Sequence, residues 1–158
     1  MDCIKKEYLI IIALFFGTLL ASDSLKIKGT EEKRPGLIEV SITGIDTTKA
    51  GGLIVNLYTE DSWNKPLKVF RQLKCNKGID SEMTVVFDSI PFPEEYAVQV
   101  IHDSDGNGKL TMKWLPPGPK EGAGVSNYIP TGIPKFQKAK FYFNGAKKGV
   151  RVVISYPE

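Results

Sequence analysis

The chain has 158 residues, a formal net charge of +3, 42% hydrophobic residues and 25% charged residues, a composition that fits one globular domain. An aromatic content of 10% argues against an intrinsically disordered chain. Because the chain holds one His and two Cys residues, multi-His zinc sites, four-cysteine metal sites and disulfide frameworks are excluded.

The N-terminal residues have the layout of a secretory signal peptide. An uncharged and almost wholly apolar run spans residues 9–20, with Lys5 and Lys6 before it and small residues after it. A membrane-spanning helix needs roughly 20 apolar residues, so this run favours cleavage over an uncleaved anchor. The sequence therefore predicts a signal helix within residues 1–24, export to the periplasm or the extracellular space, and membrane contact only through the signal before cleavage.

The next segment, residues 25–35, is charged and lacks apolar periodicity, which predicts a flexible leader before a domain at residues 36–158. Removal of the signal leaves 19 basic and 15 acidic residues, a net charge of +4. The lysines are scattered rather than gathered with aromatic residues, which argues against nucleic-acid binding, so we expect an envelope or extracellular partner. Cys75 would be the one Cys left, and we expect a free thiol there rather than a nucleophile.

Alternation of apolar and polar residues predicts six strands in this domain. The strands are centred on Val40, Val55, Val85, Val98, Tyr142 and Val152. A seventh strand is expected at residues 110–114, and apolar residues at helical spacing predict one short helix within residues 66–74. Turn residues rather than helices separate the strands. The predicted fold class is therefore all-β, an antiparallel β-sandwich of about seven strands, with a closed barrel as the alternative.

The densest polar cluster lies at residues 102–110 and matches the first half of a calcium-binding loop, D-x-[DN]-x-[DN]-G. Asp103, Asp105 and Asn107 would supply side-chain oxygens, Gly108 would make the sharp turn, and Lys109 would supply its carbonyl oxygen. Calcium is the one cofactor that the sequence suggests.

The second half of that calcium loop is missing. A complete loop ends in a Glu that binds the ion through both oxygens, and here Trp114 stands at that position. A further carboxylate would have to come from elsewhere in the chain, and Glu121 and Asp88 are the candidates.

A structural alternative without calcium competes at the same loop. Asn107 and Gly108 would supply the positive φ angles of a tight hairpin turn. Asp103 and Asp105 would then cap backbone N–H groups instead of binding a metal ion.

Three functional classes are compatible with these features. The preferred hypothesis is a non-catalytic binding or interaction module with a Ca2+-stabilised loop. The second is an envelope-associated hydrolase or carbohydrate-active protein, which would need a site that joins His102, Glu121 and Ser126, although no G-x-S-x-G motif occurs. The third is an adhesive surface domain that contacts its partner through edge strands or through residues 116–134, a segment rich in Pro and Gly.

Two motifs in chain order carry a resemblance to a known family. H-D-x-[DN]-x-N-G-K-L begins at His102, and P-K-E-G-x-G-x-S-N begins at Pro119. With their flanking segments they resemble an uncharacterised bacterial exported family, domain of unknown function 2141, over residues 36–156. The resemblance implies a signal-bearing, all-β protein of transthyretin-like or immunoglobulin-like type, and it implies no activity. The motif residues outside the proposed calcium ligands are His102, Gly106, Gly108, Leu110, Pro119, Lys120, Gly122, Gly124, Ser126 and Asn127.

The chain departs from the family pattern at two positions. Thr111 stands where the family often has an acidic residue, which removes a potential oxygen ligand, and Glu95 replaces the usual Gly before the strand around Val98. A resemblance to transthyretin-like hydrolases fails on chemistry, because those enzymes use more than one His and a C-terminal Tyr-Arg-Gly-Ser. This chain has one His and ends in Tyr-Pro-Glu.

Overall fold

The computed structural model describes residues 34–157 apart from residues 64 and 116. The predicted signal peptide and residues 25–33 of the predicted leader lie outside the described residues. Strand β1 (Arg34–Thr43) begins two residues before the expected domain start at Gly36. No helix in the described part of the chain is long and apolar enough to cross a membrane.

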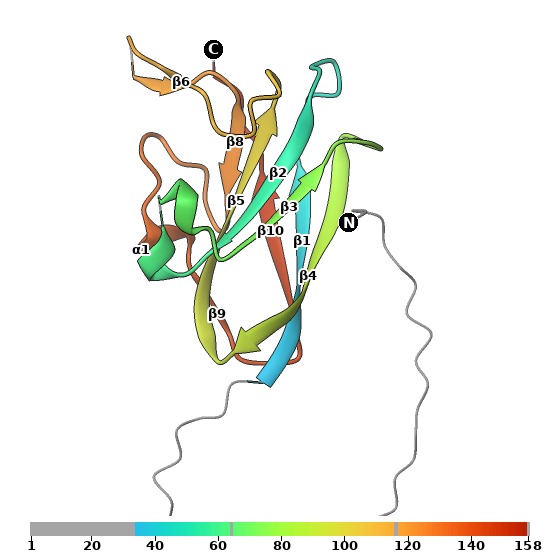
Figure 1. The fold of residues 1–158 in the computed structure, drawn as a ribbon, viewed down its shortest axis with the longest axis vertical. Helices are drawn as coiled ribbons and strands as arrows, with labels where there is room; N and C mark the ends of the chain where they lie inside the picture. The colour runs from blue at the N-terminus through green and yellow to red at the C-terminus, as the bar shows by residue number, and fades with distance from the viewer. Residues whose placement is uncertain (1–33, 64, 116, 158) are drawn as a thin grey trace, which may run out of the picture.

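Two sheets make up most of the domain (Figure 1). The smaller sheet has the strand order β10–β1–β4, in which β4 is Glu82–Phe92 and β10 is Lys147–Val153. The larger sheet has the order β3–β2–β5–β8, and β9 also pairs with β5. Its strands are β2 (Gly52–Tyr58), β3 (Arg71–Cys75), β5 (Glu94–Asp103), β8 (Gly122–Val125) and β9 (Phe141–Phe143).

Short elements complete the described fold. Strands β6 (Met112–Lys113) and β7 (Gly118–Pro119) form a two-stranded sheet. The helical elements are the 3-10 turns η1 (Glu60–Ser62) and η2 (Pro66–Lys68) and the single-turn helix α1 (Phe136–Ala139). The prediction of a mostly β fold is therefore confirmed.

One hydrophobic core lies between the two larger sheets. In β1, Ile38, Val40 and Ile42 are fully buried and alternate with more exposed residues, as expected for a strand with one face on a core. Leu53 and Leu57 of β2 belong to the same cluster, so the side chains of both sheets pack together. Strand β2 differs from β1 because it is buried along both of its faces.

The predicted helix within residues 66–74 is wrong. Only Pro66–Lys68 forms a 3-10 turn, and Arg71–Cys75 forms strand β3. Leu73 packs against the core, whereas Leu67, which would share its helical face, is fully exposed. Pairing of β3 with β2 therefore outweighs the helical spacing of the apolar residues.

Two further expectations need correction. Of residues 110–114, only Met112–Lys113 forms a strand. The smaller sheet is mixed rather than antiparallel, because β1 and β10 run parallel. The chain reaches β10 from β9 of the other sheet, and parallel neighbours require such a crossover. Cys75 is 2% exposed and disulfide-bonded in the full chain, whereas the predicted free thiol concerns the chain after removal of the signal.

The fold brings the two motif segments together. Strands β5 and β8 run antiparallel with His102 opposite Gly122. Asp103, which follows His102, and Glu121, which precedes Gly122, therefore come from adjacent strands at the same end of the sheet. Strand β6 and the C-terminal segment lie at this end as well (Figure 1).

Candidate functional site

Three carboxylates converge where β5 ends and β8 begins, and we call Asp103, Asp105 and Glu121 the acidic cluster. One ligand oxygen of each lies within 4.8 Å of the others. Glu121 is 3% exposed and Asp103 is 9% exposed, whereas Asp105 is open to solvent. The structure thus brings together three of the five residues that the sequence predicts as calcium ligands.

Glu121 fastens both ends of the loop formed by residues 104–111. Its Oε1 accepts a hydrogen bond of 2.8 Å from the Ser104 backbone N–H. Its Oε2 accepts one of 2.8 Å from the Thr111 backbone N–H. A buried carboxylate needs such partners, because an unpaired buried charge is costly. Glu121 therefore has a structural role in the 104–111 loop whether or not an ion binds.

Asp105 and Asn107 organise the exposed side of the loop. Asp105 Oδ1 accepts a hydrogen bond of 3.1 Å from the Asn107 backbone N–H, and its Oδ2 accepts one of 2.8 Å from the Thr111 hydroxyl. The Thr111 hydrogen bond is the largest of the effects that lower the pKa of Asp105. Asn107 Oδ1 accepts a hydrogen bond of 2.9 Å from the Lys109 backbone N–H. The two remaining predicted ligands, Asn107 and Lys109, thus bond to each other within the loop.

One oxygen of Asp103 is buried without a hydrogen-bond partner in the described part of the chain. Its Oδ2 accepts a hydrogen bond of 2.9 Å from the Gly108 backbone N–H. Its Oδ1 is buried and has no hydrogen-bond partner among the described residues. A buried carboxylate oxygen without a partner costs about 1–3 kcal/mol or more. This oxygen therefore needs either a cation or another compensating group.

The tight-hairpin alternative is wrong as a description of the loop. Strand β5 ends at Asp103 and β6 begins at Met112, so a long loop rather than a two-residue turn joins them. Positive φ angles occur at Gly106 (70°) and Gly108 (79°), and Asn107 is not among the positive-φ residues described. The expected capping of backbone N–H groups by Asp103 and Asp105 is nevertheless present.

His102 is buried against the C-terminal segment. It is 1% exposed, and its Nδ1 lies 2.7 Å from the hydroxyl oxygen of Tyr156. That oxygen also accepts a hydrogen bond of 2.9 Å from the Asp46 backbone N–H. Burial is the main cause that lowers the pKa of His102, which favours a neutral imidazole accepting the Tyr156 proton at Nδ1.

The ring of Tyr156 also explains why a glycine stands at position 122 of the second motif. A Cβ added at Gly122 would lie 2.2 Å from the Tyr156 ring, so only Gly fits beneath it. Sequence reasoning missed the role of Tyr156, because nothing in the C-terminal residues indicates that they return to the end of β5. A large aromatic residue near the chain end was the one available signal.

Ser126 and its neighbours connect the larger sheet to other elements. Ser126 is fully buried, and its hydroxyl accepts a hydrogen bond of 3.0 Å from the Val98 N–H and donates one of 2.6 Å to the Ala139 carbonyl. Asn127 has a φ of 71° and donates a 2.7 Å hydrogen bond to the Lys140 carbonyl. These residues of the second motif are therefore structural connectors.

The remaining motif residues lie around the same loops. A Cβ at Gly124 would lie 2.3 Å from the Val153 carbonyl oxygen, so β8 and β10 approach closely there. Lys120 donates a 2.8 Å backbone hydrogen bond to Thr111, and Pro119 pairs with Met112. Leu110 and Gly108 line a cavity over the larger sheet.

The hydrolase arrangement is not assembled in the structure. Ser126 bonds beside Val98, which is four residues from His102 along β5, a separation of about 13 Å in a strand. His102 bonds to Tyr156, and Glu121 bonds to the 104–111 loop. Each of the three side chains thus has partners outside the proposed triad.

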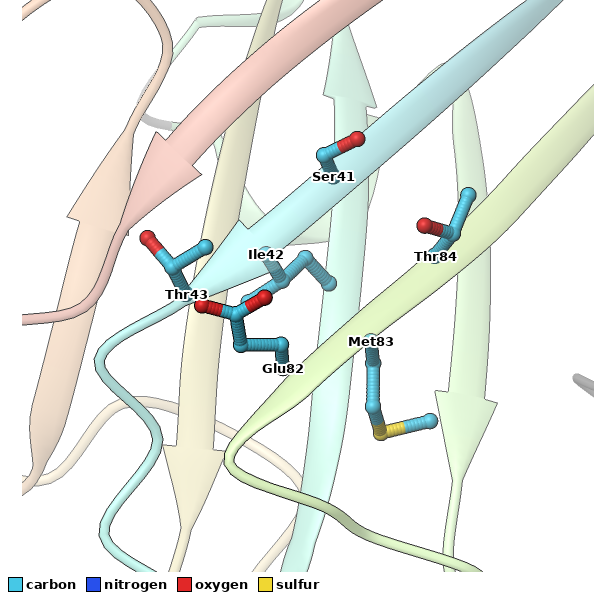
Figure 2. Close-up of a pocket in the computed structure, with 6 residues that line it drawn as sticks. All are labelled: Ser41, Ile42, Thr43, Glu82, Met83 and Thr84. Carbon is cyan, nitrogen blue, oxygen red and sulfur yellow. The ribbon is translucent and has the colours of Figure 1, made fainter.

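Asp88 and a hollow on the smaller sheet take no part in the acidic cluster. Asp88 is on β4 of the smaller sheet and is exposed, so it is not the additional carboxylate. A hollow of about 180 Å3 lies over the ends of β1 and β4, where Ser41, Thr43, Glu82 and Thr84 line it (Figure 2). None of the predicted site residues lines this hollow.

Comparisons with known proteins place the chain in a family. No curated protein and no solved structure matches it. Residues 40–151 match the family described as "Uncharacterized protein conserved in bacteria (DUF2141)". The match includes both motifs and most of the described strands, as the resemblance predicted. The chain therefore belongs to the DUF2141 family.

Proposed function

We propose that the protein is an exported, non-catalytic binding module of the β-sandwich type, whose 104–111 loop is stabilised by Ca2+ at the acidic cluster. The signal-like N-terminal run supports export. The core shared by two sheets supports the sandwich. The structural partners of His102 and Ser126 favour binding over hydrolysis.

The buried Oδ1 of Asp103 carries the metal part of the proposal. Three carboxylates whose oxygens lie within 4.8 Å repel one another, and burial of two of them strengthens that repulsion. A divalent cation would relieve the repulsion and also give Asp103 Oδ1 a partner.

The donor chemistry favours Ca2+ over softer metals. All three cluster residues offer oxygen, which is the ligand of hard cations, and no Cys or His among the described residues belongs to the cluster. Ca2+ accepts irregular coordination with several carboxylates and water molecules, whereas Mg2+ demands near-ideal octahedral geometry. A partial protein shell of this kind suits the weak calcium sites of extracellular modules.

Thermal unfolding of the purified protein with CaCl2 and with EDTA tests the proposal. We expect about 5 mM Ca2+ to raise Tm by several degrees, because extracellular calcium sites have dissociation constants of roughly 0.1–1 mM. Asp103→Asn should abolish the gain, and Asp88→Asn, an exposed carboxylate on the other sheet, should retain it. A wild-type Tm that Ca2+ leaves unchanged would contradict the metal site.

A further inference from the structure

The outer face of the larger sheet carries a second cavity, next to the 104–111 loop. Its volume is about 300 Å3, and it is bounded by β2, β3 and β5 and by residues 108–112. Three residues with amide side chains, Asn56, Gln72 and Gln99, and Tyr58 are among the residues that line it. These groups take no part in the acidic cluster.

The three amides are aligned across three adjacent strands. Asn56 of β2 stands opposite Gln72 of β3 on one side and opposite Gln99 of β5 on the other. Neighbouring strands are about 4.8 Å apart, so the amides form a continuous row. We call Gln72, Asn56 and Gln99 the amide row.

Hydrogen bonds orient this row. Gln72 Nε2 donates to Asn56 Oδ1 at 2.8 Å, and the Tyr58 hydroxyl donates a longer bond of 3.4 Å to Gln99 Oε1. Each amide offers two N–H donors and an acceptor oxygen, so the row has more bonding capacity than these two contacts use. Side chains held in this way can bind a ligand with little loss of rotamer freedom.

The buried member of the amide row, Asn56, is unusual for its place in the fold. Asn56 is 4% exposed in the middle of a central strand, where Asn is disfavoured and a buried amide must be satisfied. Ile54 and Ile101, which face the same cavity, show that apolar residues fit this surface. Polar residues at the centre of the face are therefore better explained by a ligand than by packing.

The cavity offers hydrogen bonds rather than charge. Among the described residues that line it, Lys109 is the one with a charged side chain at neutral pH. The apolar lining residues provide contact surface for carbon-bound hydrogens, and the amides and Tyr58 suit hydroxyl groups. This combination fits a neutral, hydroxyl-rich molecule.

We propose that the amide row and Tyr58 form a subsite for a neutral oligosaccharide. The inference rests on the proposed binding function and names its ligand class, but the amide row does not depend on the metal. The 104–111 loop connects the acidic cluster to the cavity. Gly108, whose N–H bonds to Asp103, is one of the residues that line the cavity. Calcium at Asp103 would therefore hold that wall in place and tighten saccharide binding.

Calorimetric titration of the purified protein with neutral tetrasaccharides tests this subsite. The probes are maltotetraose, cellotetraose, xylotetraose and chitotetraose at roughly 10 mM, which detects millimolar affinity, with tetragalacturonate as the charged comparison. At least one neutral probe should bind, and Gln72→Ala and Asn56→Leu should each weaken that binding at least tenfold. Gln137→Ala, which changes an exposed amide on α1, should leave it unchanged.

The outcomes separate the two proposals. Binding of none of the neutral probes, binding of tetragalacturonate alone, or binding that both amide-row variants leave intact would overturn the subsite. If Asn56→Leu does not fold, saccharide binding by Gln72→Ala decides the outcome. Gln72 is exposed on β3, so its replacement should leave the fold intact. Saccharide binding in a protein that Ca2+ does not stabilise would refute the metal site alone, and calcium stabilisation without saccharide binding would refute the subsite alone.

Discussion

The hydroxyl oxygen of Tyr156 lies 2.7 Å from Nδ1 of His102, so the end of the chain is fastened to the strand that leads into the acidic cluster. The same oxygen accepts the Asp46 backbone N–H at 2.9 Å. One hydroxyl therefore satisfies two buried or half-buried polar groups from different parts of the sequence.

Replacing Tyr156 by Phe tests this contact. The variant keeps the ring over Gly122 but leaves His102 Nδ1 and the Asp46 N–H without their partner, which should destabilise the protein by about 1–3 kcal/mol. Urea denaturation followed by Trp fluorescence measures the change. Tyr142→Phe, in an exposed position of β9, is the matched control and should change stability by less than about 0.5 kcal/mol.

Gly122→Ala tests the close approach of Tyr156. The added methyl group would overlap the Tyr156 ring, so the ring must move away from His102, and we expect a loss of about 1–3 kcal/mol. In the double variant Gly122→Ala/Tyr156→Leu the ring that the methyl group would overlap is gone. Its loss of unfolding free energy should therefore be much smaller than the sum of the losses in the two single variants. Gly149→Ala has open space at its Cβ and should be tolerated, and equal losses at both glycines would contradict the steric explanation.

Ser126→Ala separates structure from catalysis at the second motif. The change leaves the Val98 N–H and the Ala139 carbonyl without the buried hydroxyl, which should cost about 1–3 kcal/mol of unfolding free energy. Ser155→Ala, with a long and exposed hydrogen bond to Ala123, serves as the control and should cost little. Full stability of Ser126→Ala in denaturation would show that the hydroxyl is not a connector.

The buried phenol of Tyr96 should make the stability of the protein fall at alkaline pH. It is 1% exposed and donates a 2.9 Å hydrogen bond to the Pro91 carbonyl, and burial raises its pKa to about 12 from 10.0. The unfolded chain thus loses this proton at a lower pH than the folded protein. The stabilisation is complete below pH 10 and is lost as the pH rises through about 12.

Denaturation at a series of pH values measures the effect. The wild type should lose stability more steeply than Tyr96→Phe above pH 10, because the variant has no phenol to ionise. Parallel curves for the two proteins over this range would contradict the raised pKa.

Strand alternation was a reliable guide where one face of a strand packs on the shared core. The patterns around Val40, Val55 and Val85 correspond to β1, β2 and β4 because their buried faces meet in one cluster. Strand β8 escaped prediction because its two glycines have no side chain to alternate. The spacing of Leu67 and Leu73 suggested a helix that pairing of β3 with β2 overrides.

The acidic cluster was predictable in composition but not in detail. The calcium-loop motif indicated Asp103 and Asp105, and Glu121 was one of two candidates for the further carboxylate. Antiparallel pairing of β5 and β8 brings Glu121 to the cluster. The sequence did not reveal that Asn107 Oδ1 accepts a hydrogen bond from the Lys109 backbone N–H within the loop. The partner of His102 and the amide row depend on long-range contacts and on register, which residue spacing does not reveal.

The sharpest test of the calcium site is calorimetric titration of Ca2+ into the wild type and into Asp103→Asn, together with the stability of both proteins without calcium. We predict one site in the wild type and none in the variant. We also predict that without calcium the variant is more stable by about 1 kcal/mol, since an amide in place of the unpartnered Oδ1 can donate to the neighbouring carboxylates. Absence of calcium binding to the wild type, or equal binding to both proteins, would contradict the proposed metal site.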